Sequence, residues 1–596
     1  MSIVSLSKVT IYGHVDDKAS ILEDLQDMGC LHIVPLKSQT SFPGSGGPSS
    51  QAREALKFLL SCRRKRRQVK DPSKFNAVDV EERTLEIQRC IQVLEDERDF
   101  LQQRILDLRP WGNFTFPPSE ALQGLLLWFF VVPLNDMKDV KATDLTWEVV
   151  ARDNRFAYVV VVERDEPQGM PIPRTRTGNR PVSELELRLD EVELELEDLQ
   201  AERASLTRWC RLYASSLFQL EDRETLLEVT HHTLDENPVF VLQAWTPLEE
   251  VPRLSRYARE KGLALEAEAP KPQDNPPTFL RNRPSLASGQ DLVSFYMTPN
   301  YWLWDPSAVV FFSFAVFFAM ILSDAGYALI MGLGLCLGWK KMGRSDSGQR
   351  LRVLFGSLVG ASAVWGILVG SYFGIAPPEG SFLAGFSALD LNDYDSMMQI
   401  SIFIGVGHLT LANLADLRSR GLVLSALVPV GWIIIFLGAV LLWMGADKVS
   451  SASILETSGM TAMVLGAAAV VFFTPAEGSF WKRLLAGLIA LTKITSAFGD
   501  ALSYLRLFAL GLASASLAVA FNDLAHQVRS ALPGFGILFA LIVLLIGHGL
   551  NFLLAIVSGF IHGLRLNFIE FFNWSLPEEG RPFRAFARKE TSAWNQ

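Results

Sequence analysis

Cysteine is scarce in this sequence, and no cysteine stands near another. Five cysteines are spread over 596 residues, without a Cys-x-x-Cys pair or a set of nearby ligand partners. Such spacing supports neither a disulfide framework nor a zinc site. The sequence also lacks a Gly-x4-Gly-Lys-Ser/Thr loop, so it offers no phosphate-binding loop of that kind. No charged segment followed by an apolar leader opens the chain, and we therefore expect the N-terminus to stay in the cytosol.

An excess of basic charge is also missing. The formal net charge is -9 and the pI is near 5.6. No basic stripe with interleaved aromatic residues occurs, which argues against a nucleic-acid-binding protein. In contrast, 49% of the residues are hydrophobic and 20% are charged, with a mean hydropathy of +0.22. This is too apolar for an ordinary soluble protein and too charged for a purely membrane-embedded one, so we expect two unlike halves.

A strand-helix-strand pattern occurs at both ends of the N-terminal half. Residues 5–34 show it first, as a βαβ start, and residues 237–268 repeat it. We expect the two to join into one proximal α/β globule made of residues 1–50 and 230–270. The Gly/Ser/Pro-rich stretch 42–50 lacks the lysine of a phosphate loop and is typical of a flexible linker.

Two runs of heptad-spaced apolar residues predict two long helices. The first covers residues 80–108 and the second residues 185–220, and an arginine interrupts each run once. The economical arrangement is an antiparallel coiled-coil stalk, and the alternative is a set of independent amphipathic helices on ordinary cores. The stalk would bring together two pairs of residues: Arg98 with Arg203, and Leu101 with Leu199.

The stalk helices are predicted within residues 51–110 and 180–228, with a distal α/β globule at 111–179 between their far ends. The run Arg63 to Arg67 is interpreted as the solvated end of a helix that begins near Gln51. Within the distal globule we expect strands at 125–132, 145–151 and 156–162 and a short helix at 135–140.

From residue 308 onward, apolar runs long enough to span a bilayer recur between polar breaks. We expect residues 308–575 to form an all-α transmembrane domain, with a linker at 286–307 before it and a tail at 576–596 after it. Two of the runs are short and need tilt or helical extension. The eight predicted spans are residues 308–322, 328–339, 351–372, 397–414, 422–444, 460–473, 484–521 and 535–564.

Lysine and arginine gather in alternate breaks between these runs. The poorer set of breaks offers only Lys448 and Arg529. By the positive-inside rule the richer set is cytoplasmic, which places both termini in the cytosol and the acidic loop of Asp390, Asp393 and Asp395 outside. The richer set comprises Lys340, Lys341, Arg344, Arg350, Arg352, Arg418, Arg420, Lys482, Arg483, Arg581, Arg584, Arg588 and Lys589.

Arg506 lies midway along the seventh run, too far from either end to reach water easily. A guanidinium near the bilayer centre costs at least ~3 kcal/mol, so we interpret Arg506 as the functional centre of the chain. The alternative is an amphipathic surface helix with this arginine at the headgroups. Projected as one continuous helix, the run carries a polar stripe that suits an ion path. The stripe consists of Thr492, Thr495, Ser496, Gly499, Ser503, Arg506 and Ser514.

The eighth run carries a second polar stripe, made of His548, Asn551, Ser558, His562 and Arg565. Taken alone, Arg565 is typical of an interfacial anchor. Together with two histidines and an asparagine, and opposite the stripe of Arg506, it favours an ion path. Asp500 and Glu570 complete the candidate ion-translocation set, with no catalytic or metal-binding residue proposed. Asp324, in a tight break, is more typical of a turn than of an ion ligand.

These residues carry a resemblance to a known family. Along its whole length the chain resembles the I subunit, or a-subunit, of vacuolar- and archaeal-type rotary ATPases. The Tyr-Leu-Arg-Leu of residues 504–507 and the His-Gly-Leu-Arg-Leu of residues 562–566, followed by Glu570, are the most specific matches. Departures are mild: Ala328 stands where many members have glycine, and residues 298–304 are a looser version of the usual segment. Further matches are residues 275–278, Asp305-Pro306 and residues 324–327.

The resemblance implies a stator subunit. Its soluble stalk and globules would hold the peripheral stalks (E/G subunits) and the central-stalk C/d subunit. Its two long tilted helices would face a ring of proteolipid c-subunits (K/L type). Arg506 would make each passing ring carboxylate release its ion, and offset polar stripes would form two half-channels. No cofactor is implied, and a multi-pass protein of a prokaryotic plasma membrane is expected.

Two other readings of the sequence stay open. One is a free-standing secondary transporter with a cytosolic domain, which an internal repeat in the eight spans would favour, and none is convincing. The other is a coiled-coil membrane scaffold, which leaves the charged stripes unexplained. The sequence leaves open both H⁺ and Na⁺ as the ion and both directions of operation, since selectivity would rest mainly on residues of the ring.

Overall fold

The computed structural model describes two compact units, which are taken separately here. One unit comprises residues 1–39 and 229–587 with residue 596, and the other comprises residues 40–228 and 588–595. Part of the expected linker at 42–50, together with Asp390 and Lys448, lies outside the described residues. Described are residues 2–589 except 38–47, 118–121, 123, 379, 390–392, 422, 447–451, 476–479, 532–533 and 577.

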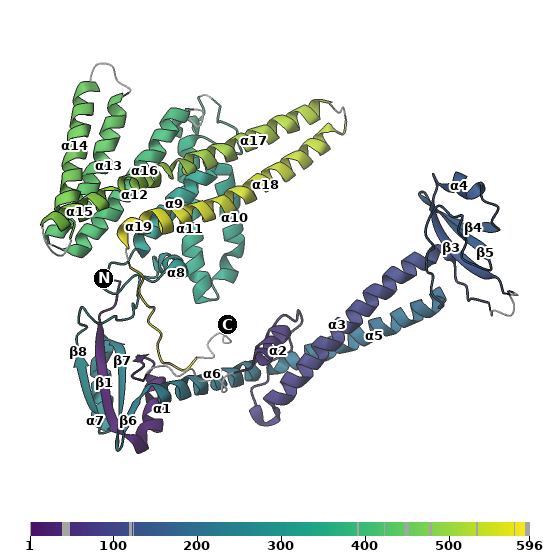
Figure 1. The fold of residues 1–596 in the computed structure, drawn as a ribbon, viewed down its shortest axis with the longest axis horizontal. Helices are drawn as coiled ribbons and strands as arrows, with labels where there is room; N and C mark the ends of the chain where they lie inside the picture. The colour runs from purple at the N-terminus through teal and green to yellow at the C-terminus, as the bar shows by residue number, and fades with distance from the viewer. Residues whose placement is uncertain are drawn as a thin grey trace. The chain divides into compact units, whose positions relative to one another are not determined.

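The second unit is built on two long helices, α3 (Ala77–Leu108) and α5 (Val182–Leu206), which lie side by side in Figure 1. Asn76 starts α3 because its side chain accepts a hydrogen bond from the Val78 amide. Two ion pairs show that the helices are antiparallel: Arg83–Glu202 at 2.7 Å and Arg188–Glu97 at 2.8 Å. The core between them includes the buried residues Ile87, Leu94, Leu101, Val192 and Leu196.

The register of this helix pair differs from the predicted one. The ion pairs place Leu101 near residue 184, so Leu199 lies about 20 Å further along the helix at 1.5 Å per residue. Arg98 pairs with its neighbour Asp99, and Arg203 stacks on Phe58 at 3.8 Å. The predicted pairings of Arg98 with Arg203 and of Leu101 with Leu199 are therefore wrong.

Each of the two predicted stalk regions contains more than one helix. The first contains α2 (Ser50–Leu60) and α3, and α2 ends before the basic run at 63–67, so that run follows a helix end instead of forming it. The second has a 3-10 turn at Thr207–Trp209 before α6 (Cys210–His232). Beyond that turn the apolar seam changes partner, because Cys210, Tyr213 and Leu217 pack on Ala52, Ala55 and Leu59 of α2.

The far end of the α3–α5 pair carries a small antiparallel sheet. It consists of β3 (Leu126–Pro133), β4 (Trp147–Arg152) and β5 (Phe156–Glu163) in the order β3-β5-β4, with the short helix α4 (Met137–Lys141). Trp111, in the 3-10 turn Arg109–Trp111 that follows α3, meets Phe129 and Tyr158 edge-on, which fixes the sheet to the helix end.

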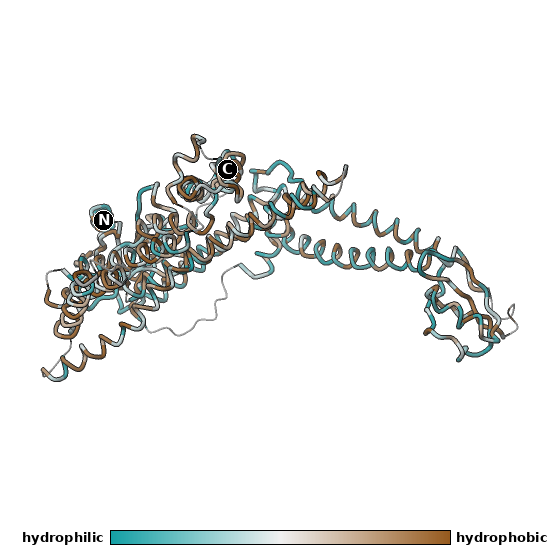
Figure 2. The backbone as a smooth tube through the Cα atoms, turned by 90° about the horizontal axis from the view of Figure 1, so that it is seen from above, coloured by the Kyte–Doolittle hydropathy of each residue, from teal (hydrophilic) through white to brown (hydrophobic). Residues whose placement is uncertain are grey.

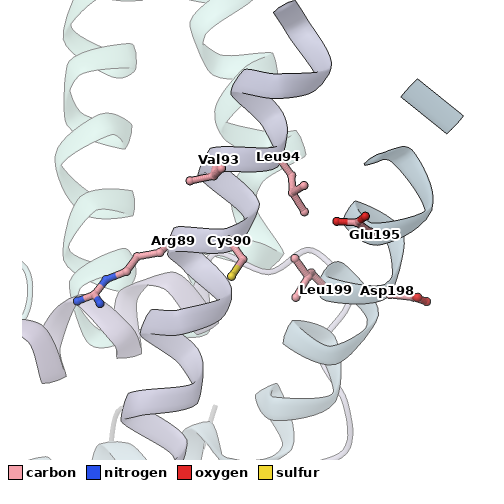
Figure 3. Close-up of a pocket in the computed structure, with 7 residues that line it drawn as sticks. All are labelled: Arg89, Cys90, Val93, Leu94, Glu195, Asp198 and Leu199. Atoms are coloured by element: carbon pink, nitrogen blue, oxygen red, sulfur yellow. The ribbon is translucent and has the colours of Figure 1, made fainter. Parts of the chain in front are cut away.

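An open groove runs along the α3–α5 pair (Figure 3). Cys90, Leu94 and Leu199 face the gap between the helices, whereas Arg89 and Asp198 point away from it. Along the helix axes the groove lies between the two ion pairs, since Cys90 stands midway between Arg83 and Glu97 on α3. It is lined by Arg89, Cys90, Val93, Leu94, Glu195, Asp198 and Leu199.

The first unit contains a five-stranded sheet formed by both ends of the N-terminal half. Its strands are β1 (Leu6–His14), β2 (His32–Val34), β6 (Leu234–Glu236), β7 (Val239–Pro247) and β8 (Ala264–Glu268). The order is β2-β7-β1-β8, with β6 beside β7. The βαβ start therefore does not pair with itself, since β1 and β2 both lie antiparallel to β7. Two helices belong to this globule, α1 (Lys18–Met28) and α7 (Val251–Glu260).

The remaining helices of the first unit are mostly apolar, as their brown colour in Figure 2 shows. The predicted linker at 286–307 contains a helix, α8. Asp324 caps the N-terminus of α10, because its side chain accepts a hydrogen bond from the Tyr327 amide. The helices are α8 (Ala287–Tyr296), α9 (Ser307–Leu322), α10 (Ala325–Met342), α11 (Asp346–Val369), α12 (Tyr394–Arg420), α13 (Leu427–Ala446), α14 (Ala452–Phe473), α15 (Phe480–Leu491), α16 (Ile494–Leu502), α17 (Leu505–Ala531), α18 (Gly536–Arg565) and α19 (Phe572–Ser575).

Six helical stretches are long and apolar enough to cross a membrane within the described part of the chain. A seventh, α9, is apolar but shorter. The expected number of eight stays a prediction. The six stretches are Asp346–Val369, Tyr394–Arg420, Leu424–Gly445, Ile454–Phe473, Phe480–Ala531 and Gly536–Ser575.

The segment after α19 returns to the sheet globule of the same unit. The Thr278 amide donates to the Arg581 carbonyl at 2.7 Å, and the Phe586 amide donates to the Leu31 carbonyl at 2.6 Å. Phe586 is buried. The beginning of the predicted tail thus connects the last apolar helix to the sheet globule through backbone hydrogen bonds.

Candidate functional site

Two arginines and one glutamate meet where α17 begins and α18 ends. Glu570 Oε1 lies 3.8 Å from Arg506 Nη1 and 3.8 Å from Arg565 Nε. The Glu570 side chain is only 2% exposed, against 22% for Arg506 and 49% for Arg565. At 3.8 Å these are ion pairs without hydrogen bonds. Arg506 Nη1 and Glu570 Oε2 have no hydrogen-bond partner among the described residues, so the cluster holds unused donor and acceptor capacity.

The glutamate reaches this position through a change in the helix. Residues Leu566–Phe571 form a π-helix between α18 and α19. π-Helical turns are rare in proteins, and those that do occur are often found at functional sites. The wider turn shifts the side chains that follow it. Asn567 anchors the turn by donating to the Gly563 carbonyl at 2.9 Å. Glu570 is thereby buried against both arginines.

The position of Arg506 depends on a break in the helix before it. The predicted span 484–521 is wrong as one continuous helix, because α15, α16 and α17 are separated at residues 492–493 and 503–504. Tyr504, in the second break, is fully buried, and its hydroxyl lies 2.8 Å from His408 Nδ1 on α12. Its ring also packs directly on Gly405. Packing of Tyr504 on α12 thus holds the turn from which Arg506 projects.

The predicted polar stripe of the seventh run is divided by these breaks. Ser496 is exposed, and the Ser503 hydroxyl donates to the Gly499 carbonyl of the preceding turn. Asp500 lies apart from the arginines' ion pairs and accepts a hydrogen bond from Trp574 Nε1 at 2.8 Å. Ser514 is buried further along α17. Only Arg506 of this stripe joins the cluster with Glu570.

A second polar group links α10, α17 and α18. Asn551 donates to the Ser514 carbonyl at 2.8 Å and to the Tyr327 hydroxyl at 2.9 Å. The Tyr327 hydroxyl lies 2.8 Å from His548 Nδ1, and His548 Nε2 lies 3.0 Å from Asn522 Oδ1. Three predicted residues, Ser514, His548 and Asn551, are therefore brought together.

The other predicted residues of the eighth run lie between these two groups. Ser558 and His562 are half-buried on α18, one to two turns before Arg565. His562 Nδ1 lacks a hydrogen-bond partner in the part of the chain that the structure describes. Asp324 Oδ2 accepts from Ser371 and from the Gly374 amide, so its oxygens are used in holding a turn.

Sequence reasoning missed four residues of these groups: Tyr327, His408, Tyr504 and Asn522. Tyr327, His408 and Tyr504 each stand in a mostly apolar stretch without a periodic partner, and Asn522 lies just beyond the end of the predicted span 484–521, beside Asp523. Tyr327 and Tyr504 did stand inside the quoted motifs, which was a signal. The described residues contain no group of three or more His, Cys, Asp or Glu placed to hold a metal ion.

No protein-family model matches the chain. The chain is 28% identical to "V-type ATP synthase subunit I" of Chlamydia pneumoniae, over 87% of this chain and 86% of that protein. It is 26% identical to "V-type ATP synthase subunit I 1" of Treponema pallidum, over 96% and 97% of the two chains. The chain is therefore similar to bacterial ATP synthase subunit I proteins over most of its length.

Archaeal subunit I proteins are similar as well. The "A-type ATP synthase subunit I" of Methanocaldococcus jannaschii is 26% identical over 67% of this chain and 63% of that protein. A solved structure of the cytoplasmic N-terminal domain of subunit I, described as a homologue of subunit a of V-ATPase, is 17% identical and covers 44% of this chain and 99% of its own. Its TM-score of 0.21 is too low to establish a shared arrangement.

Proposed function

We propose that this chain is the stator a-type subunit of a V/A-type rotary ATPase. It couples translocation of H⁺ or Na⁺ to ATP hydrolysis or synthesis and performs no nucleotide chemistry itself. The observation that carries the proposal is the cluster of Arg506 and Arg565 around buried Glu570, on the two longest apolar helical stretches of a subunit I relative.

The cluster has the electrostatics that the proposal needs. Two unit charges 4 Å apart attract by about 4 kcal/mol at an effective dielectric constant near 20. A ring carboxylate that reaches Arg506 would thus have its pKa lowered by about 3 units and would release its ion. The Arg506 side chain is 22% exposed, so part of it can be reached by a visiting carboxylate, whereas Nη1 is buried beside Glu570. The same fixed charge repels a cation that would otherwise leak directly between the two sides.

The finer architecture belongs to the same proposal. The eight spans would be α9, α10, the four single helices α11 to α14, the broken run α15 to α17, and α18 with α19. Both termini would be cytoplasmic in a prokaryotic plasma membrane, with the α3–α5 pair as a coiled-coil stator arm. The partners would be the proteolipid c-ring, the peripheral-stalk E/G subunits and the central-stalk C/d subunit.

Purification of the chain under mild detergent tests this assignment. We expect an ATPase and a proteolipid ring to accompany the chain. Purification of the chain alone, together with solute uptake by vesicles that contain only this chain, would instead establish the secondary-transporter alternative. If the chain purifies without an ATPase or a proteolipid ring and its vesicles take up no solute, the result would favour the third alternative, a coiled-coil membrane scaffold.

A further inference from the structure

The polar group of Tyr327, His548, Asn522, Asn551 and Ser514 forms a directional chain of hydrogen bonds. Asn522 Nδ2 donates to the Phe373 carbonyl at 2.8 Å, so its Oδ1 is the acceptor that faces His548 Nε2 at 3.0 Å. His548 Nε2 therefore carries the hydrogen, and its Nδ1 accepts from the Tyr327 hydroxyl at 2.8 Å. The Tyr327 oxygen in turn accepts from Asn551 at 2.9 Å.

Burial changes along this chain from one end to the other. Tyr327 is 0% exposed and Asn551 is 2% exposed, whereas His548 and Asn522 are half-exposed. Ser514 lies eight residues after Arg506 on α17, about 12 Å along the helix axis. The chain thus runs from the interior on the Arg506 side toward the surface at the ends of α17 and α18 that residues 532–535 join.

The chemistry of the chain suits a proton and not a metal cation. Na⁺ needs several free oxygen ligands, whereas the Tyr327, Asn522 and Asn551 oxygens each accept a hydrogen bond from protein. An imidazole can take up a proton at one nitrogen and release one from the other, and a hydroxyl can donate and accept together. His548 and Tyr327 are the two members with that capacity for passing protons between the buried and the exposed end.

We propose that Tyr327 and His548 are proton-relay residues of the half-channel on this side, and that Asn551 and Asn522 position them. The proposal rests on the proposed function. In one passage Tyr327 takes up a proton at its oxygen from a hydronium ion on the Ser514 side and gives its own hydroxyl proton to His548 Nδ1, which makes His548 an imidazolium. A turn of the imidazolium ring then carries Nδ1 toward the exposed end, where Nδ1 loses this proton to water. Nε2 keeps its hydrogen throughout, so the ring returns in its starting tautomer. One proton enters and one leaves, no electron is transferred, and the reverse passage runs through the same groups.

The charge environment of the relay is simple. Tyr327 of α10 contacts His548 directly, and Asp324, which caps α10, acts on His548 only through its charge. On α17 it faces the neutral Asn522, and its remaining ring neighbour is Phe373. Loss of the imidazole should therefore remove one limb of the pH profile of ion uptake, which a purely structural role of His548 would not do.

The test uses the intact complex, purified from cells that carry Tyr327→Phe or His548→Gln and reconstituted into vesicles. The phenylalanine lacks only the hydroxyl, and the glutamine keeps a donor and an acceptor but holds no extra proton. Tyr372→Phe is the matched control, because the Tyr372 hydroxyl is buried without a hydrogen-bond partner among the described residues. ATP-driven acidification, uptake of radioactive Na⁺ and complex yield are measured with and without Na⁺.

We expect wild-type acidification to need no Na⁺. Both relay variants should acidify at least about tenfold more slowly per assembled complex, and His548→Gln should lose a pH limb. Tyr372→Phe should match the wild type. Wild-type rates per complex in both variants, or a loss that only follows complex yield, would overturn the relay while ion pumping stands. Uptake of radioactive Na⁺ in place of acidification would overturn its proton selectivity, and absence of all ion uptake by the wild type would overturn the proposed function itself.

Discussion

Gly405→Ala should disable ion translocation although residue 405 touches neither arginine. A Cβ built on Gly405 would lie 2.5 Å from the Tyr504 ring, whereas ordinary contacts begin at 3.4 Å. The ring must therefore retreat by about 1 Å, at a cost of about 1–3 kcal/mol for an overpacked core. The hydrogen bond of 2.8 Å between Tyr504 and His408 would then lengthen beyond bonding distance.

The consequence reaches the site because Tyr504 lies two residues before Arg506 in the turn that starts α17. A misplacement of about 1 Å in a preorganised site costs up to about 100-fold in rate. Gly407→Ala is the matched control. Gly407 lies on the same helix, and a Cβ built there would meet nothing within 4 Å. Both substitutions gain the same helix propensity. The assay is ATP-driven ion uptake by vesicles with equal amounts of assembled complex, and equal rates for the two variants would refute the packing argument.

Three further outcomes follow from the stalk and the second arginine. In a cysteine-free background, Glu97→Cys with Arg188→Cys should be joined within one chain by a short bismaleimide. Leu101→Cys with Leu199→Cys should not, and the opposite result would restore the register predicted from the heptads. The hydrogen bonds from Arg188 lower the pKa of Glu97, so this pair stabilises the helices above the ordinary glutamate pKa and loses its contribution as pH falls through the lowered value. Arg188→Gln should therefore lower the Tm slightly at pH 7 and less at pH 3, since the pair is exposed; an equal Tm difference at both pH values would contradict this. Arg565→Ala should slow ion uptake less than Arg506→Ala, because Arg565 is the more exposed of the two; a complete loss of uptake in Arg565→Ala would contradict this order.

The sequence located the charged residues better than the shape of the helices that carry them. Arg506, Arg565 and Glu570 stand out because charges in long apolar runs are costly and therefore informative. The breaks at 492–493 and 503–504 gave no such signal, because Leu- and Ala-rich segments favour continuous helix. The second break coincides with the packing of Tyr504 on Gly405 and His408, about 100 residues away in sequence, and the π-helix that buries Glu570 has no local sequence signature.

The stalk shows the same limit in another form. A heptad pattern identifies the buried face of each helix but not the level at which two helices meet, since a slide by seven residues preserves the seam. The ion pairs of Arg83 and Arg188 set that level in the structure. Likewise, the loss of Arg203 from the seam depends on its contact with Phe58 of α2, a helix that lies outside both heptad runs.

Ion uptake by the reconstituted complex with Arg506→Ala tests the central claim most directly. Vesicles that hold equal amounts of wild-type and variant complex are energised with ATP, and ion uptake is followed in both. The account predicts assembled complex and no uptake with alanine. It predicts little or none with Arg506→Lys, because an ammonium is compact and strongly hydrated and cannot spread its donors over two carboxylate positions. Wild-type uptake by the alanine variant would contradict the account.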